Sequence, residues 1–254
     1  MLDLDQLEKD TKGSLARNKM ILLLLFAFFS LLMVGFLLSG PPLSASEQAV
    51  LFRIPNSSTD FMELIDVMKR YAATSYSYTL AVFCFAFLFL QSFGIPGPII
   101  LSIISGALFG RWTGLFLVTL CSTVGSSVCY FLSNTRGRGL VVRAFPRYVA
   151  IINHKLQSQR DKLLYYLLFL RLAPVVPNWL INLSAPILGI DKRAFVTATF
   201  FGLIPANILL IQSGLTLSDM HEVGLSYEAV GVLFVLGLLA LVPTMLAKQR
   251  QVAE

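Results

Sequence analysis

A single arginine stands inside one of the most apolar stretches of this sequence. Arg171 is the only charged residue in the run Leu163–Leu172, and Pro174 follows three positions later. A charge at membrane depth is costly and by default marks a pathway or a binding site. Two plainer roles stay open: an arginine that extends its charged end to the membrane surface, or one that binds carbonyl groups freed by the proline.

Other polar side chains are expected at a similar depth. Gln91 holds the corresponding place in an earlier apolar stretch, Asn178 and Asn182 follow Pro174, and Gln212 lies in a later apolar run. Amide groups both donate and accept hydrogen bonds. Together with Arg171, these residues predict a weakly polar groove inside the membrane.

The earlier apolar stretch, residues 87–116, cannot be one continuous helix. Four helix-breaking residues interrupt it: Gly94, Pro96, Gly97 and Pro98. Proline removes a backbone donor and clashes with the preceding turn, and the freed polar groups are tolerated at depth only inside protein or beside water. We therefore expect a re-entrant helical hairpin near residues 87–110. The alternative is a proline-kinked helix that spans the membrane.

A second copy of this pattern follows about 80 residues later. An apolar arm leads to Arg171, a break at Pro174 and Pro177, and a return arm that ends in glycine, which predicts a second hairpin near residues 163–190. Ser105–Gly110 in the first copy is echoed by Ser184–Gly189 in the second. Paired broken segments in two halves of a chain are typical of inverted repeats around a midplane pathway.

Composition places the chain in a membrane. The 254 residues are 56% hydrophobic and 13% charged, with a mean hydropathy of +0.74, which is rare in a soluble domain. No nucleic-acid motif accompanies the net charge of +6. The three cysteines lie inside apolar runs and form neither a disulfide framework nor a metal spacing. The fold class we predict is an all-α polytopic membrane protein.

Charges in the loops predict the topology. We expect a cytosolic segment at 1–19, a first span at 20–39, an outer loop at 40–78, a core at 79–217 that holds both hairpins, a last span at 229–247 and a cytosolic tail at 248–254. The basic loop 134–162 then faces the cytosol and the Lys/Arg-free loop 218–228 faces outward, as the positive-inside rule requires. A cleaved signal peptide is the alternative for the first span.

Two further sets of residues carry expectations. Small residues let membrane helices approach closely, and this role is predicted for five glycines: Gly106, Gly110, Gly125, Gly189 and Gly202. Asn56 begins the glycosylation sequon Asn56-Ser57-Ser58, which is as readily unused as used.

Residue patterns typical of proton-coupled transporters and of enzymes are missing from the sequence. No Asp or Glu occurs between Asp66 and Asp161, so no carboxylate relay for protons is visible. His154 and His221 lie in loops, and no nucleophile elbow or phosphate-binding loop is present. We expect a protein that is not an enzyme and that needs no cofactor and no metal.

Several strings in the chain resemble the DedA/VTT-domain superfamily. They are Phe89–Gly97, Ser105–Gly110 and Phe169–Pro186, the last with its Phe-Leu-Arg-x-x-Pro-x-x-Pro-Asn-Trp pattern. The resemblance covers about residues 79–247. It is nearest to the eukaryotic transmembrane protein 41 group, and more to its A than its B member.

This resemblance implies two opposed re-entrant hairpins, an endoplasmic reticulum location that makes the 40–78 loop lumenal, and ATP-independent scrambling of phospholipids. The family's arginine corresponds to Arg171. Bacterial relatives carry acidic residues near the first proline motif, where this chain has Gln91 and Pro98, so proton coupling is not expected to carry over. Our hypothesis is that Arg171 attracts the lipid phosphate while Gln91 and Asn178 add weaker hydrogen bonds.

Two other classes of function stay open. One is an ion-coupled transporter of a lipid or small solute, whose flux would respond to pH or sodium. The other is a membrane scaffold that moves nothing itself and recruits lipid-transfer proteins through its basic loop. Membrane phospholipids are the expected partners, nucleic acid is not, and the oligomeric state is open.

Overall fold

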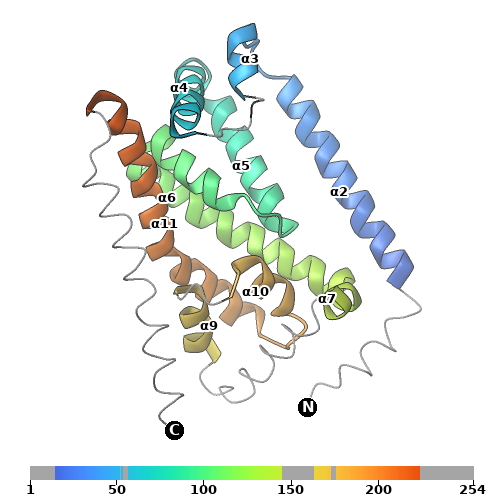
Figure 1. Ribbon diagram of the computed structural model, residues 1–254. Helices are drawn as coiled ribbons and strands as arrows, with labels where there is room; N and C mark the ends of the chain where they lie inside the picture. Colours follow the sequence, from blue (N-terminus) through green and yellow to red (C-terminus); the bar gives the residue numbers. More distant parts are fainter. Residues whose placement is uncertain (1–14, 52, 54–56, 145–162, 173–175, 224–254) are drawn as a thin grey trace.

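The structure, a computed structural model, describes residues 15–51, 53, 57–144, 163–172 and 176–223, and within these ranges it is all-helical (Figure 1). The helices run in the following order: α2 (Leu15–Leu38), α3 (Ala45–Leu51), α4 (Ser58–Thr74), α5 (Tyr76–Ser92), α6 (Pro98–Leu132), a π-helical turn (Ser133–Gly137), α7 (Arg138–Ala144), α9 (Leu163–Leu172), α10 (Asn178–Ser184) and α11 (Lys192–Val223).

Three of the described helices are long and apolar enough to cross a membrane. They are Ala16–Leu38, Pro98–Gly137 and Lys192–Thr216, and the shorter helix Tyr76–Ser92 is also apolar. A spanning helix needs about 20 apolar residues. The prediction of an all-α polytopic membrane protein is therefore confirmed. The predicted last span at 229–247, the terminal segments 1–14 and 248–254, and Asn56 lie outside the described residues.

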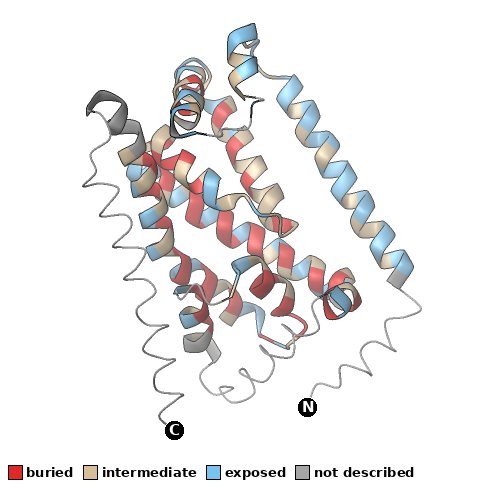
Figure 2. Cartoon of the chain, in the orientation of Figure 1, coloured by how far each residue is buried: buried red, intermediate tan, exposed pale blue. Residues whose placement is uncertain are grey.

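The first span, α2, stands apart from the rest of the protein (Figure 1). Its side chains are largely exposed along its length, whereas α5, α6, α10 and α11 carry most of the buried residues (Figure 2). Two polar contacts hold its ends: Tyr78 Oη donates to the carbonyl of Phe36 at 2.7 Å, and Arg136 donates to Asn18 at 3.2 Å. An apolar surface of this kind is suited to lipid.

The segment predicted as an outer loop contains two helices, α3 and α4. Helix α4 begins after Ser57, whose side chain accepts from the backbone N–H of Asp60, a standard N-terminal cap. Its residues Ile65, Val67 and Ala72 are buried, and the helix contacts α5, α6 and α11. The polar composition of residues 40–78 concealed this amphipathic helix, because only one face needs to be apolar.

The expected break after α5 is present and reverses the chain. Helix α5 ends at Ser92, Gly94 and Gly97 adopt φ of +65° and +153°, and α6 begins at Pro98. Proline fits the first turn of a helix because no N–H is needed there. Phe109, twelve residues into α6, packs on Phe83 with ring centroids 5.2 Å apart, so the beginning of α6 runs back along α5.

A second reversal, at Gly110, divides α6. Gly110 has φ +76° and ψ 179°, which is not helical. The expectation that Gly110 and Gly189 serve helix packing is wrong, because both have positive φ and nothing lies within 4 Å of the place where a Cβ would be. They are the glycines that allow the chain to turn, at the middle of α6 and before α11.

The two longest helices, α6 and α11, approach at backbone contact. A Cβ on Gly106 would overlap the carbonyl of Ile211, and a Cβ on Gly214 would overlap the carbonyl of Ile103. Small residues at such crossings are the usual way for membrane helices to pack closely. This crossing joins the first half of the chain to the second.

Candidate functional site

The first helix break lies against α10, the helix that follows the second break. Gly94 lies in the first break. A Cβ placed on it would lie 3.8 Å from Leu183 Cδ1 and 3.9 Å from Trp179 Cβ, and both of these residues belong to α10. Helix α10 follows the second break, with Pro177 as its N-cap residue. Pro174 lies outside the described residues. The polar groups that follow the two breaks are therefore close enough to interact.

A chain of hydrogen bonds crosses this junction from the first half. Gln91, at the end of α5, donates from Nε2 to the hydroxyl of Ser126 at 2.8 Å. Ser126, in the second part of α6, is fully buried and also accepts from Asn182 Nδ2 at 3.1 Å. Asn182 is fully buried too. One hydroxyl thus connects an amide of each half.

Arg171 completes the chain from the other side. Its guanidinium donates to Asn182 Oδ1 at 2.7 Å, to Thr199 Oγ1 at 2.9 Å and to Asn178 Oδ1 at 3.2 Å. The carbon of the guanidinium lies 5.2 Å from the ring centre of Phe195, within range of a cation–π contact. We call Gln91, Ser126, Asn182, Arg171, Asn178 and Thr199 the polar junction.

The charge of Arg171 is buried, with its side chain 4% exposed. No ion pair with an acidic residue of the described ranges is recorded for it. Three of its five N–H groups donate to neutral oxygens, so two find no partner within the described part of the chain. Charge-assisted hydrogen bonds to a carboxylate or phosphate are the strongest that a guanidinium makes.

The two halves pack their polar residue in the same way. A Cβ on Gly125 would meet Gln91 Cβ at 2.6 Å, and a Cβ on Gly202 would meet Arg171 Cβ at 2.6 Å. In each case the neighbouring helix also presents the leucine three positions earlier, Leu88 or Leu168. Glycine at these places lets the long polar side chain lie flat against the facing helix.

The structure brings together four of the five residues predicted to line a groove: Gln91, Arg171, Asn178 and Asn182. Asn178 is the member that lies exposed. Gln212 lies elsewhere, where it accepts from Arg111 at 2.9 Å on an exposed part of α6 and α11. Gly94, Pro96, Gly97 and Pro177 lie between helices, as expected, and Pro98 is the first residue of α6.

Sequence reasoning missed two members of the polar junction. Thr199 lies three positions before Gly202 and so shares a helix face with it, whereas Ser126 directly follows Gly125 in the chain. Small polar residues beside such glycines were the available signal. Among the described residues no cluster of His, Cys, Asp or Glu could hold a metal ion.

Comparison with known proteins agrees with this architecture. The family model described as "VTT domain" matches residues 95–216, which include the second part of the first break, the polar junction apart from Gln91, and most of α11. These features define a polytopic α-helical membrane protein with a VTT domain. No solved structure matches the chain.

Curated relatives extend the similarity over nearly the whole chain. The chain is 35% identical over 242 residues to a transmembrane protein 41 homolog of Caenorhabditis elegans, covering 94% of this chain and 98% of that protein. It is 34% identical over 239 residues to transmembrane protein 41B of Mus musculus, covering 93% and 82%. The chain therefore belongs to the transmembrane protein 41 family. The nearer likeness to the A member stays a prediction.

Proposed function

We propose that this protein is an ATP-independent phospholipid scramblase of the endoplasmic reticulum membrane, with both termini in the cytosol. The observation that supports the proposal is the polar junction: a buried cation, without an ion-pair partner among the described residues, linked by neutral hydrogen bonds to the end of α5 beside the first helix break. A lipid headgroup needs such a polar path, while its tails stay in the surrounding hydrocarbon.

We further propose that both breaks belong to re-entrant hairpins of an inverted repeat. The return of Phe109 to the start of α5 supports this for the first hairpin. The matched packing of Gln91 on Gly125 and of Arg171 on Gly202 supports a common ancestry of the two halves. Hairpins that enter from opposite faces would thin the apolar barrier from both sides.

In this mechanism Arg171 attracts the phosphate through its unused N–H groups, and the exposed Asn178 meets the headgroup first. A hydrogen bond to a charged group contributes about 1.5–3 kcal/mol, so two of them bind a phosphate without trapping it. The amides of Gln91 and Asn182 offer weaker contacts beyond it. No bond is made or broken in the lipid, and the proposal involves no enzyme chemistry and no cofactor.

The test is lipid access in liposomes that hold the purified protein. A headgroup-labelled phospholipid is present in both leaflets, and dithionite added outside destroys the accessible label. We expect loss well beyond the outer-leaflet half without ATP or an ion gradient. Arg171→Met should slow this loss strongly. Arg111→Met is the matched control, because Arg111 is exposed and outside the polar junction, and it should scramble like the wild type.

One observation also fits a transporter of small anions. The buried Arg171 would bind a carboxylate or phosphate of a soluble molecule by the same hydrogen bonds. Dithionite loss that stops near half in the wild type, together with uptake that depends on pH or sodium, would favour this function. If neither dithionite access nor gradient-dependent uptake is observed, the remaining function is that of a membrane scaffold that recruits lipid-transfer proteins.

A further inference from the structure

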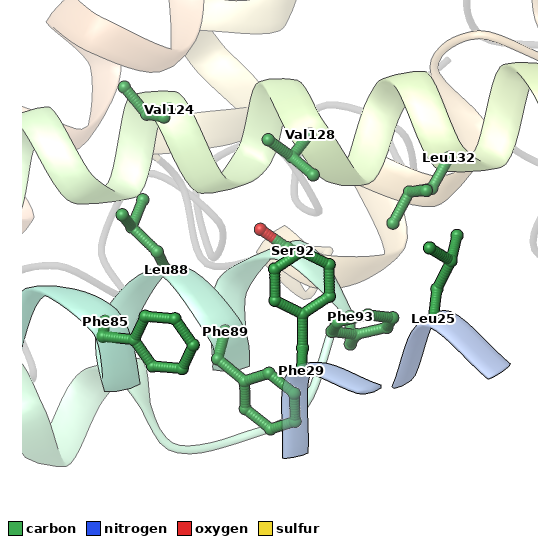
Figure 3. Close-up of a pocket in the computed structure, with 10 residues that line it drawn as sticks. All are labelled: Leu25, Phe29, Phe85, Leu88, Phe89, Ser92, Phe93, Val124, Val128 and Leu132. Carbon is green, nitrogen blue, oxygen red and sulfur yellow. The ribbon is translucent and has the colours of Figure 1, made fainter. Parts of the chain in front are cut away.

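A cavity lies between α2 and the rest of the protein, and its lining contains no residue of the polar junction (Figure 3). Its volume is about 290 Å³. Leu25 and Phe29 of α2 face Phe89 and Ser92 of α5, and Val124 and Val128 of α6 point toward them from the opposite wall. We call this cavity the α2 slot.

The lining of the α2 slot excludes water as its occupant. The hydroxyl of Ser92 is the one polar side-chain group in its wall, and every other side chain is aliphatic or aromatic. A water molecule in a cavity typically needs two to four polar partners, and apolar cavities of this kind stay dry. An empty slot would forfeit the dispersion contacts of its lining, so an apolar occupant is favoured.

The size of the α2 slot favours a thin occupant over a helix of a partner protein. An α-helix with side chains is about 10 Å wide, and the slot has a volume of about 290 Å³. A flexible hydrocarbon chain is much thinner. The medium around α2 supplies such chains, because the outward residues Leu24, Leu31 and Leu38 are 61%, 72% and 81% exposed in a helix of spanning length.

We infer that the α2 slot binds one acyl chain of a membrane phospholipid. The chain lies between Phe29 and Val128 and fills the space that α2 leaves open beside α5 and α6. It adds apolar contact to α2. The other contacts of this helix include a hydrogen bond near each end and the ring contacts of Phe26 with Phe89 and Phe93. This inference concerns resident lipid and does not depend on whether the protein moves lipid.

The experiment uses the full chain in liposomes with a phospholipid that carries a diazirine within one acyl chain. After illumination, peptides are mapped for adducts. Leu24 serves as the reference for lipid-facing surface, and Ser92, 9% exposed, reports entry into the slot. We expect adducts at both in the wild type. Val128→Phe fills the slot and should lower the Ser92 to Leu24 ratio severalfold, whereas Val34→Phe, on the exposed side of α2, should leave it unchanged.

Two further variants keep the test decisive. Phe29→Ala widens the α2 slot and should raise labelling at Ser92. Val124→Phe fills the slot from a neighbouring turn and replaces Val128→Phe if that variant does not fold. The inference is overturned if the wild type shows no adduct at Ser92. It is also overturned if the Ser92 to Leu24 ratio in both filling variants equals that of the wild type. It is also overturned if excess sterol, but not excess unlabelled phospholipid, removes the adduct. Labelling requires no movement between leaflets, so its failure is distinct from failure of scrambling.

Discussion

Replacing Asn182 by leucine should destabilise the protein much more while Arg171 is present than after Arg171 is removed. Asn182 is fully buried and accepts the shortest hydrogen bond of the guanidinium, at 2.7 Å. Leucine has a similar volume but no oxygen, so the substitution leaves a buried cation with one partner fewer. Removing the cation as well, with Arg171→Met, removes the group that needed the partner.

The size of the effect follows from these contacts. Loss of a hydrogen bond to a charged group costs about 1.5–3 kcal/mol, and the bond from Asn182 to Ser126 adds about 0.6 kcal/mol, the average between membrane helices. Asn182→Leu alone should therefore lower the free energy of unfolding by about 2–3.5 kcal/mol. In the Arg171→Met background the same change should cost less than about 1 kcal/mol. The coupling energy is then about 1.5–3 kcal/mol.

The assay is reversible unfolding in mixed micelles with increasing SDS, followed by the fluorescence of the chain's two tryptophans, Trp112 and Trp179. The four proteins of the cycle are the wild type, both single variants and the double variant. A second cycle of Arg171 with Asn178 is the matched control. Asn178 is exposed and its bond is longer, 3.2 Å, so its coupling should stay below about 1 kcal/mol.

A coupling energy within about 0.5 kcal/mol of zero for Arg171 and Asn182 would refute the reasoning, because independent sites add to that accuracy. Equal coupling in both cycles would also contradict it. Arg171→Met by itself should change the free energy of unfolding little, because it removes a buried charge that has no ion-pair partner among the described residues but also leaves the oxygens of Asn182 and Thr199 without that donor. The same variant should scramble slowly, so stability and transport should separate.

Three further predictions test the packing. Gly214→Val should prevent folding, or lower the free energy of unfolding by more than about 3 kcal/mol, because its Cβ would overlap a backbone carbonyl of α6. The measurement is the yield of protein extracted in detergent, which Gly35→Val should leave unchanged because the space beside Gly35 on α2 is open. Tyr78→Phe loses its bond to the last turn of α2 and should lower the midpoint of thermal unfolding by the equivalent of about 0.5–1.5 kcal/mol; an unchanged midpoint would show that this bond does not hold α2. Gln91→Leu loses its bond to Ser126 and should cost about 0.6 kcal/mol while slowing dithionite access; wild-type access would remove Gln91 from the pathway.

Local chemistry was enough to predict the first span, the break after α5 and the importance of Arg171. The run of apolar residues at 20–39 predicts a span because its length matches the bilayer, and the span is found as Ala16–Leu38. The prolines and glycines of residues 94–98 predict a break because they act on their own backbone. Arg171 was singled out because a charge in an apolar run is costly wherever the run folds.

Contacts between distant residues could not be predicted in this way. Gln91 and Ser126 are 35 positions apart, and Ser126 and Asn182 are 56 apart. No local pattern encodes which helix faces meet across such distances, so the link between the two halves emerged only from the packing. The same holds for Thr199, an ordinary residue of α11 until Arg171 is placed beside it.

The sequence by itself determined the class of protein, the family, the helix breaks and the polar residues that matter, because each depends on composition or on neighbours along the chain. The tertiary structure alone decided that these polar residues form one buried junction, that Gly110 and Gly189 turn the chain rather than pack helices, and that α2 stands off to leave a slot. Those properties depend on the distance between helices, which the close approach of α6 and α11 at Gly106 and Gly214 sets.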